Sequence, residues 1–75
     1  MKIRTQYQTN AAGTGQILAK GGGKQRTLTY DHSLGVRGNH RAAAEAVAHV
    51  HGVSIFPGTH TVWLPEGRAE FEVGS

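Results

Sequence analysis

The stretch Asn39-His-Arg-Ala-Ala-Ala-Glu-Ala-Val-Ala-His-Val-His-Gly52 decides the fold, because it is the segment that most strongly favours a helix. Its five alanines carry the lowest cost of any residue type in a helix. Asn39 is a favourable N-cap, and Gly52 suits the left-handed position that commonly ends a helix. We therefore expect one helix over about residues 39–51.

The apolar residues of this helix predict how it is covered. Ala43, Ala46, Val47 and Val50 stand at the spacing i, i+3, i+4 and i+7, which indicates one apolar stripe. Because these side chains are small, the stripe must lie close to its partner. We expect that partner to be a β-sheet with larger side chains.

The rest of the chain has the pattern of short strands and turns. Alternating side chains and turn residues predict strands over residues 2–9, 14–20, 24–30, 59–64 and 68–73. The triple glycine at 21–23 predicts a hairpin turn within an antiparallel meander. A short apolar run at 53–56 is closed by Pro57-Gly58, and the last two strands form a C-terminal hairpin over about 59–73. The order β-β-β-α-β-β is an α+β class, with an antiparallel sheet backed by a single helix in one small domain, 1–75.

Composition narrows the class of protein. The chain has 75 residues and no cysteine, so we expect a small core without a disulfide framework. No apolar run reaches membrane-span length, and the N-terminus lacks the apolar region of a signal peptide. We expect a cytoplasmic protein with no membrane contact. No arrangement of nucleophile, base or paired carboxylates stands out, and so small a chain encloses no ordinary substrate pocket, so we expect neither an enzyme nor a bound cofactor.

The charge distribution points to an anionic partner. Lysine and arginine outnumber aspartate and glutamate by 8 to 5, and the first 41 residues hold all but one of these cations against the single acid Asp31. Alternation predicts an outward sheet face made of Arg4, Gln6, Gln8, Gln16, Lys20, Gln25, Thr27 and Thr29. Arginine and lysine suit phosphates, and glutamine suits adenine edges. We expect nucleic-acid contact through the N-terminal sheet, chiefly by Arg4, Gln6, Lys20, Lys24 and Arg26; a merely solvated face is the alternative.

A second interpretation concerns protein contacts. In the predicted fourth strand, Trp63 lies on the face opposite Val62 and Leu64, so one of these faces is exposed or meets a partner. Tryptophan and phenylalanine are frequent interface anchors. We therefore consider binding to a host protein, or assembly of a homo-oligomer, through the alanine-rich helix or the Trp63 hairpin. The residues concerned are Ala42, Ala46, Phe56 and Trp63.

The five histidines do not form a predicted metal site. His49 and His51 stand about 200° apart around a helix, so they cannot share one ion without unwinding the last turn. Exposed, titrating histidines are the simpler interpretation.

Two resemblances add to these expectations. Gly23-Lys-Gln-Arg-Thr-Leu-Thr-Tyr30, followed by the helix around 42–47, resembles the arm-type DNA-binding domain of tyrosine recombinases over residues 2–51. That resemblance implies a three-stranded sheet that lays its exposed face in the DNA major groove. The whole chain also resembles small orphan proteins of actinobacteria and their phages, through Gly23–Arg26, Tyr30–His32 and Asn39–Ala44. This second resemblance implies no activity, but it suggests a phage accessory protein in the host cytoplasm.

Overall fold

The protein folds into a five-stranded antiparallel sheet and one α-helix, and the computed structural model describes residues 1–56 and 59–73. The helix α1 (Gly35–Val50) follows a short 3-10 turn, η1 (His32–Leu34). The strands are β1 (Lys2–Thr9), β2 (Gly15–Gly21), β3 (Lys24–Thr29), β4 (His60–Leu64) and β5 (Arg68–Glu72). The α+β class, the order β-β-β-α-β-β and the C-terminal hairpin are confirmed. The turn expected at Pro57-Gly58 lies outside the described residues.

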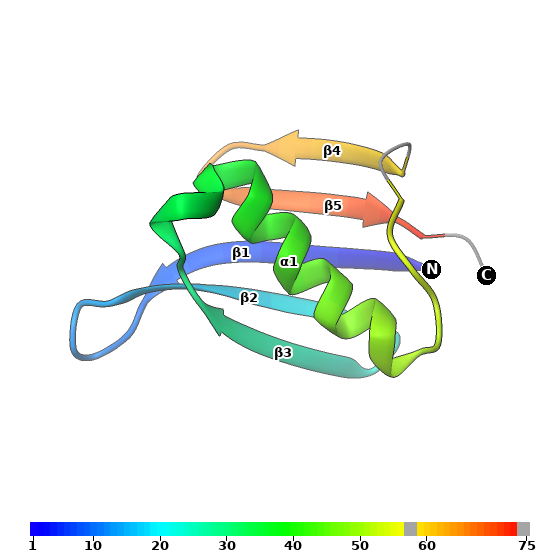
Figure 1. The fold of residues 1–75 in the computed structure, drawn as a ribbon, viewed down its shortest axis with the longest axis horizontal. Coiled ribbons are helices and arrows are strands. Elements are labelled where there is room, and N and C mark those ends of the chain that lie inside the picture. Colours follow the sequence, from blue (N-terminus) through cyan, green and yellow to red (C-terminus); the bar gives the residue numbers. More distant parts are fainter. Residues whose placement is uncertain (57–58, 74–75) are drawn as a thin grey trace.

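The C-terminal hairpin joins the same sheet as the N-terminal meander. The strand order is β3-β2-β1-β5-β4, so β1 is the central strand and is paired on both sides (Figure 1). Beyond the ladder, the Met1 ammonium donates to the Val73 carbonyl at 2.9 Å, and the Val73 amide donates to the Met1 carbonyl at 2.8 Å. Residues from opposite ends of the chain therefore form the middle of the sheet.

The helix crosses one face of the sheet and leaves the other face uncovered (Figure 1). On the helix side, small residues meet across the interface: Ala19 and Ala69 of the sheet, and Ala43, Ala44 and Ala48 of the helix, are all 0–1 % exposed. The larger apolar side chains of the core include Ile3, Ile17, Val47 and Phe71, which are 0–2 % exposed. Alanines on both layers let the helix lie close to the sheet, as the predicted small-residue stripe required.

The start of the helix differs from the prediction. The helix begins at Gly35, and Asn39 is a buried residue of its second turn instead of its N-cap. The Asn39 side chain accepts from the Asp31 amide at 2.7 Å and donates to the carbonyls of Asp31 at 2.7 Å and Gly35 at 2.6 Å. An asparagine side chain can bond the free backbone groups of a preceding turn as readily as those at a helix N-terminus, because its amide both donates and accepts hydrogen bonds.

The buried side of the helix is also rotated from the predicted stripe. Ala43 and Val47 are buried as expected, but Ala46 is half-buried and Val50 is 38 % exposed. The full buried set is Asn39, His40, Ala43, Ala44, Val47 and Ala48. The apolar pattern missed this side because its first buried residues, Asn39 and His40 in the second helical turn, are polar and are buried through hydrogen bonds.

Glycines close the helix and the β2–β3 hairpin as predicted. Gly52 has φ +73°, its amide donates to the His49 carbonyl, and the Val53 amide donates to the Ala48 carbonyl. This pair of bonds is the Schellman arrangement. Between the paired residues Gly21 and Lys24, Gly22 and Gly23 have φ values of +57° and +80°, which favour a tight two-residue turn that only residues without a side chain adopt easily.

Candidate nucleic-acid interface

The candidate site is the face of the sheet that the helix leaves uncovered, which we call the open face. It is formed by the side chains that alternate away from the helix, and neighbouring strands place them in rows across the sheet. One row runs Val62, Glu70, Arg4, Lys20, Gln25. The next row runs Leu64, Arg68, Gln6, Leu18, Thr27.

Five cations line a shallow depression on the open face. The depression has a volume of about 790 Å³, and its charged lining residues are Lys2, Arg4, Lys20, Lys24, Arg68 and Glu70. Five positive charges against one negative charge give this surface a local net charge of +4. The whole chain carries +3, so its positive charge is concentrated here.

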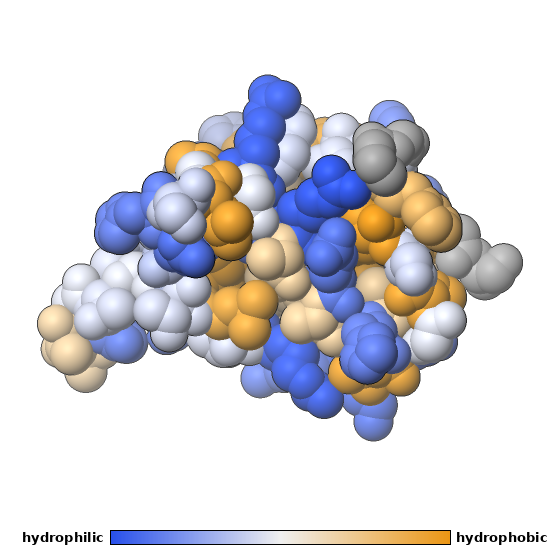
Figure 2. Space-filling view, in the orientation of Figure 1, coloured by the Kyte–Doolittle hydropathy of each residue, from blue (hydrophilic) through white to orange (hydrophobic). Residues whose placement is uncertain are grey.

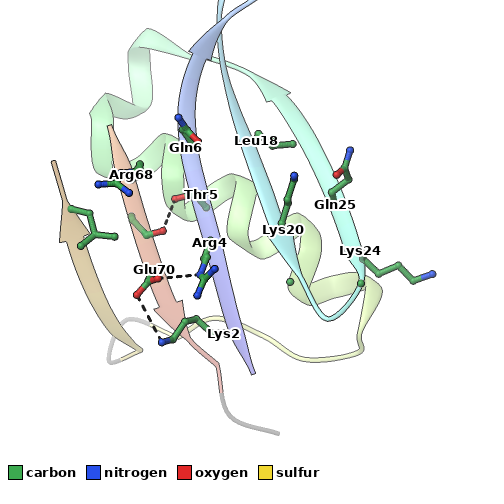
Figure 3. Close-up of a pocket in the computed structure, with 14 residues that line it drawn as sticks. Lys2, Arg4, Thr5, Gln6, Leu18, Lys20, Lys24, Gln25, Arg68 and Glu70 are labelled. Atoms are coloured by element: carbon green, nitrogen blue, oxygen red, sulfur yellow. Dashed lines mark hydrogen bonds and ion pairs between the residues drawn. The ribbon is translucent and has the colours of Figure 1, made fainter. Parts of the chain in front are cut away.

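Two of these cations have the same charge as a direct cross-strand neighbour. Arg4 of β1 is opposite Lys20 of β2, and both side chains point away from the helix (Figure 3). Like charges in directly opposite positions destabilise a sheet, and a bound anion relieves that repulsion. Arg4 is also directly opposite Glu70 of β5, which offsets part of the repulsion, so Lys20 is the member of the pair that a bound anion would stabilise most.

Glu70 is the one acid that lines the depression, and it forms ion pairs with two of the five cations. The Arg4 Nε donates to Glu70 Oε2 at 3.1 Å, and Lys2 Nζ lies 3.9 Å from Glu70 Oε1 (Figure 3). Within the described part of the chain, Lys20 and Lys24 make no such ion pair. The charge available to a ligand is thus greatest near the β2–β3 hairpin.

The open face carries polar and aliphatic side chains but, among the described residues of its strands, no phenylalanine, tyrosine or tryptophan; its one imidazole, His60, lies on the edge strand β4. Tyr7, Trp63 and Phe71 alternate toward the helix, as their pairing with Ile17, Ala69 and Ile3 shows. Proteins that bind single strands commonly stack bases on exposed aromatic rings. A face of cations, glutamines and threonines is better suited to phosphates and groove edges.

The structure brings together most of the residues that the sequence selected for nucleic-acid contact. Arg4, Gln6 and Lys20 lie on the open face. Lys24 is paired with Gly21, on the helix side of β3, but from the end of that edge strand it lines the rim of the same depression. Arg26 does not join them. It is paired with the buried Ala19, so it lies on the helix side of the edge strand, and its Nη1 donates to the Gln25 carbonyl at 2.7 Å.

Sequence reasoning did not include Lys2, Leu18 and Arg68 in the site. The alternation of β5 correctly places Arg68 and Glu70 on the exposed side. What the sequence lacks is a signal that β5 pairs with β1. Only that pairing shows that Glu70 lies directly across from Arg4.

The residues selected for protein contact lie on the helix side and in the return loop. Ala42 and Ala46 are half-buried on the flank of the helix, beside Arg26. Phe56 is 67 % exposed and Trp63 is 38 % exposed. On this side, apolar surface gathers near the two ends of the helix and is divided by hydrophilic side chains (Figure 2).

Trp63 is also part of a cluster that links the hairpin to the helix. Its ring makes edge contacts with His40 and Phe71, both at 5.9 Å between centroids, and the Arg37 guanidinium lies 5.0 Å from its centroid. Edge-to-face rings and a cation over an indole are both favourable geometries. The half-exposed Trp63 is therefore held by the helix as well as available at the surface.

The histidines correct one expectation. His40 is 1 % exposed, and its Nδ1 shares a hydrogen bond of 2.6 Å with the Thr5 hydroxyl. Burial lowers the pKa of His40 below its ordinary value of 6.5, so the ring is neutral in the core. His51 Nε2 lies 2.9 Å from the Gly21 carbonyl and ties the helix end to the β2–β3 hairpin. His32, His49 and His60 are exposed, as predicted.

Within 1–56 and 59–73, no three histidine, aspartate or glutamate side chains gather as a metal site would require. In the same ranges, no helix combines the length and the apolar character that crossing a membrane would need. No family model matches the chain, and no curated protein or solved structure shows significant similarity to it.

Proposed function

We propose that the protein binds nucleic acid through the open face of its sheet, with Arg4, Gln6, Lys20 and Lys24 as the principal contacts and Arg68 added from β5. The observation that carries the proposal is the direct pairing of Arg4 with Lys20 inside a depression lined by five cations and one acid. Glu70 offsets part of this repulsion, and the positive charge that remains at Lys20, Lys24 and Arg68 favours a bound anion.

Duplex nucleic acid is the form that this surface suits best. The described strands of the open face offer no phenylalanine, tyrosine or tryptophan ring on which a single-stranded base could stack, while the cations, glutamines and threonines of this face can meet phosphates and groove edges. A sheet surface is one of the established ways of entering a groove. The resemblance to arm-type DNA-binding domains implies a three-stranded sheet backed by one helix, which β1, β2, β3 and α1 match, while β5 and β4 extend the sheet beyond that pattern.

Fluorescence anisotropy with a labelled duplex of mixed sequence tests the proposal. Arg4 is already paired with Glu70, so we count only Lys20, Lys24 and Arg68 as meeting one phosphate each. The logarithm of the binding constant then falls against the logarithm of salt concentration with a slope of about −2.7. Affinity then drops about 40-fold between about 50 mM and about 200 mM salt. A duplex that does not bind at the lower salt concentration refutes the proposal.

Two variants of equal charge separate the open face from net charge alone. Lys20→Gln removes a cation from the open face, and we expect the salt slope to become shallower by about 0.9. Arg41→Gln removes a cation from the helix, where Arg41 is paired with Glu45 at 3.4 Å. This control should bind the duplex with the affinity of the wild type. An equal loss of affinity in both variants would show that the open face is not the contact surface. A single-stranded competitor of the same length should displace the duplex poorly.

Protein binding is the second candidate function, favoured by the exposure of Phe56 and Trp63. Both side chains are apolar, and Trp63 lies on the helix side of the sheet, opposite the cations of the open face. The two functions therefore use different surfaces, and either one can be removed without the other.

A further inference from the structure

The strand β4 is an edge of the sheet without the usual protection against pairing. Only its β5 side is paired within the described structure, so the backbone groups on its outer side have no strand partner. Natural edges are commonly guarded by lysine, proline or a bulge inside the strand. β4 reads His60-Thr-Val-Trp-Leu64 and contains no lysine, arginine, aspartate, glutamate or proline.

The opposite edge shows the contrast. β3 carries Lys24 and Arg26, so two copies of this edge would bring like charges together. The protein thus guards one edge with charge and leaves the other uncharged and rich in strand-forming residues.

Both faces of β4 offer apolar contact area as well. Val62 is 39 % exposed on the open face, and Trp63 is 38 % exposed on the helix side. The helix lies mainly over β1, β2 and β3, which leaves the helix side of β4 only partly covered (Figure 1). A strand added beside β4 would cover apolar side chains on both faces and pair the free backbone groups at once.

We propose that β4 is a self-association edge, at which two copies of this chain join antiparallel around a two-fold axis through Val62. This arrangement places Val62 opposite the second copy's Val62, Thr61 opposite its Trp63, and His60 opposite its Leu64. Aromatic and β-branched cross-strand pairs are favourable, and no like charges meet. The two five-stranded sheets become one continuous sheet.

The second copy fits this edge better than a continued chain of molecules. Pairing β4 with β3 of another copy would leave a free edge at each end and would build an open filament, whereas β4 with β4 closes as a dimer. Charge supports the same choice. Four of the five cations lie on β1, β2 and β3, and only Arg68 lies on β5, so pairing at β4 keeps most of the two basic surfaces apart.

Sedimentation equilibrium at low and high protein concentration, without nucleic acid, tests the dimer. The average mass of the wild type should rise from 8.0 kDa toward twice that value. Val62→Lys would place two lysines opposite each other at the two-fold axis, and it should stay at 8.0 kDa. Val36→Lys makes the same change at a 60 % exposed valine of the first helical turn, and should behave like the wild type. A monomer at every concentration, masses well above the dimer, or a dimer that survives Val62→Lys overturns the proposal.

Amide hydrogen exchange supplies a reading that does not depend on a variant. In the wild type, exchange at residues 60–64 should slow as concentration rises, while the β3 edge is unchanged. A dimer whose β4 exchange does not respond forms elsewhere and also overturns the proposal. Lys20→Gln leaves β4 unchanged, so it should lose duplex affinity and still dimerise, which separates a failure of the nucleic-acid function from a failure of the dimer.

Discussion

Replacing Asn39 with alanine is expected to cost about 3 kcal/mol of folding stability. The Asn39 side chain makes three hydrogen bonds to the backbone of the 31–35 turn, and a bond of this kind contributes about 1 kcal/mol net. Asn39 is 3 % exposed, so water does not readily take over the bonds that the variant loses. The alanine variant would leave both backbone groups of Asp31 without this partner.

The loss is large for a protein of this size. A domain of 75 residues has a stability of about 4–11 kcal/mol, so the variant removes a quarter or more of it. With an unfolding entropy of about 0.16 kcal/mol per degree, the melting temperature falls by about 19 °C. The physical cause is local: the turn that starts the helix loses the group that connects it to the second helical turn.

Urea unfolding followed by circular dichroism measures the effect, with Asn10→Ala as the matched control. The Asn10 side chain also accepts two backbone bonds, from Ala12 at 2.9 Å and Thr14 at 3.0 Å, but in an exposed loop. We expect that control to lose less than about 1 kcal/mol, at an unchanged urea dependence. If Asn39→Ala unfolds within about 0.5 kcal/mol of the wild type, or no more easily than Asn10→Ala, the role assigned to Asn39 is wrong.

Below about pH 6.5, His40 binds a proton in the unfolded chain but not in the folded protein, because burial lowers its folded-state pKa. As the pH is lowered, the free energy of unfolding therefore decreases by up to about 1.4 kcal/mol per pH unit. The decrease stops once the pH is below the folded-state pKa. Urea unfolding at about pH 7.5 and about pH 5.5 should show this loss in the wild type and a smaller one in His40→Gln. Glu70→Gln frees the two cations that the carboxylate holds, so duplex affinity in anisotropy should rise and the salt slope should steepen; weaker binding would contradict the proposed face. Gly22→Ala should lower the melting temperature more than Gly23→Ala: both have positive φ, but a Cβ at Gly22 would meet His51 Cε1 at 2.6 Å and one at Gly23 meets nothing within 4 Å.

The arrangement of local elements could be predicted because local patterns encode it. The alternation of β1 matched Lys2–Thr9 at both ends, and the helix ended at Gly52 through the left-handed residue expected there. The outward residues of β1, β2 and β3 were also correct, since side chains of a strand alternate whatever the strand pairs with. Arg26 was assigned to the nucleic-acid face by its charge, although the alternation of its own strand puts it on the other side.

The helix shows where apolar pattern alone is insufficient. A hydrophobic stripe is found by its apolar residues, but the first buried turn contains Asn39 and His40, which are buried through hydrogen bonds to Asp31, Gly35 and Thr5. Those partners lie on β1 and in the turn before the helix. No spacing within the helix reports them, so the predicted stripe was rotated and its start was placed four residues late.

The sequence by itself determined the elements, their order, and which side chains of each strand face the same way. Only the tertiary structure decided that β5 pairs with β1. This pairing brings Glu70 and Arg68 to Arg4 and Gln6, and leaves β4 as an uncharged edge. The physical reason is that alternation and helix propensity are properties of neighbouring residues, whereas strand order depends on how distant segments bury one shared core. The charge balance of the open face and the free edge both follow from that order.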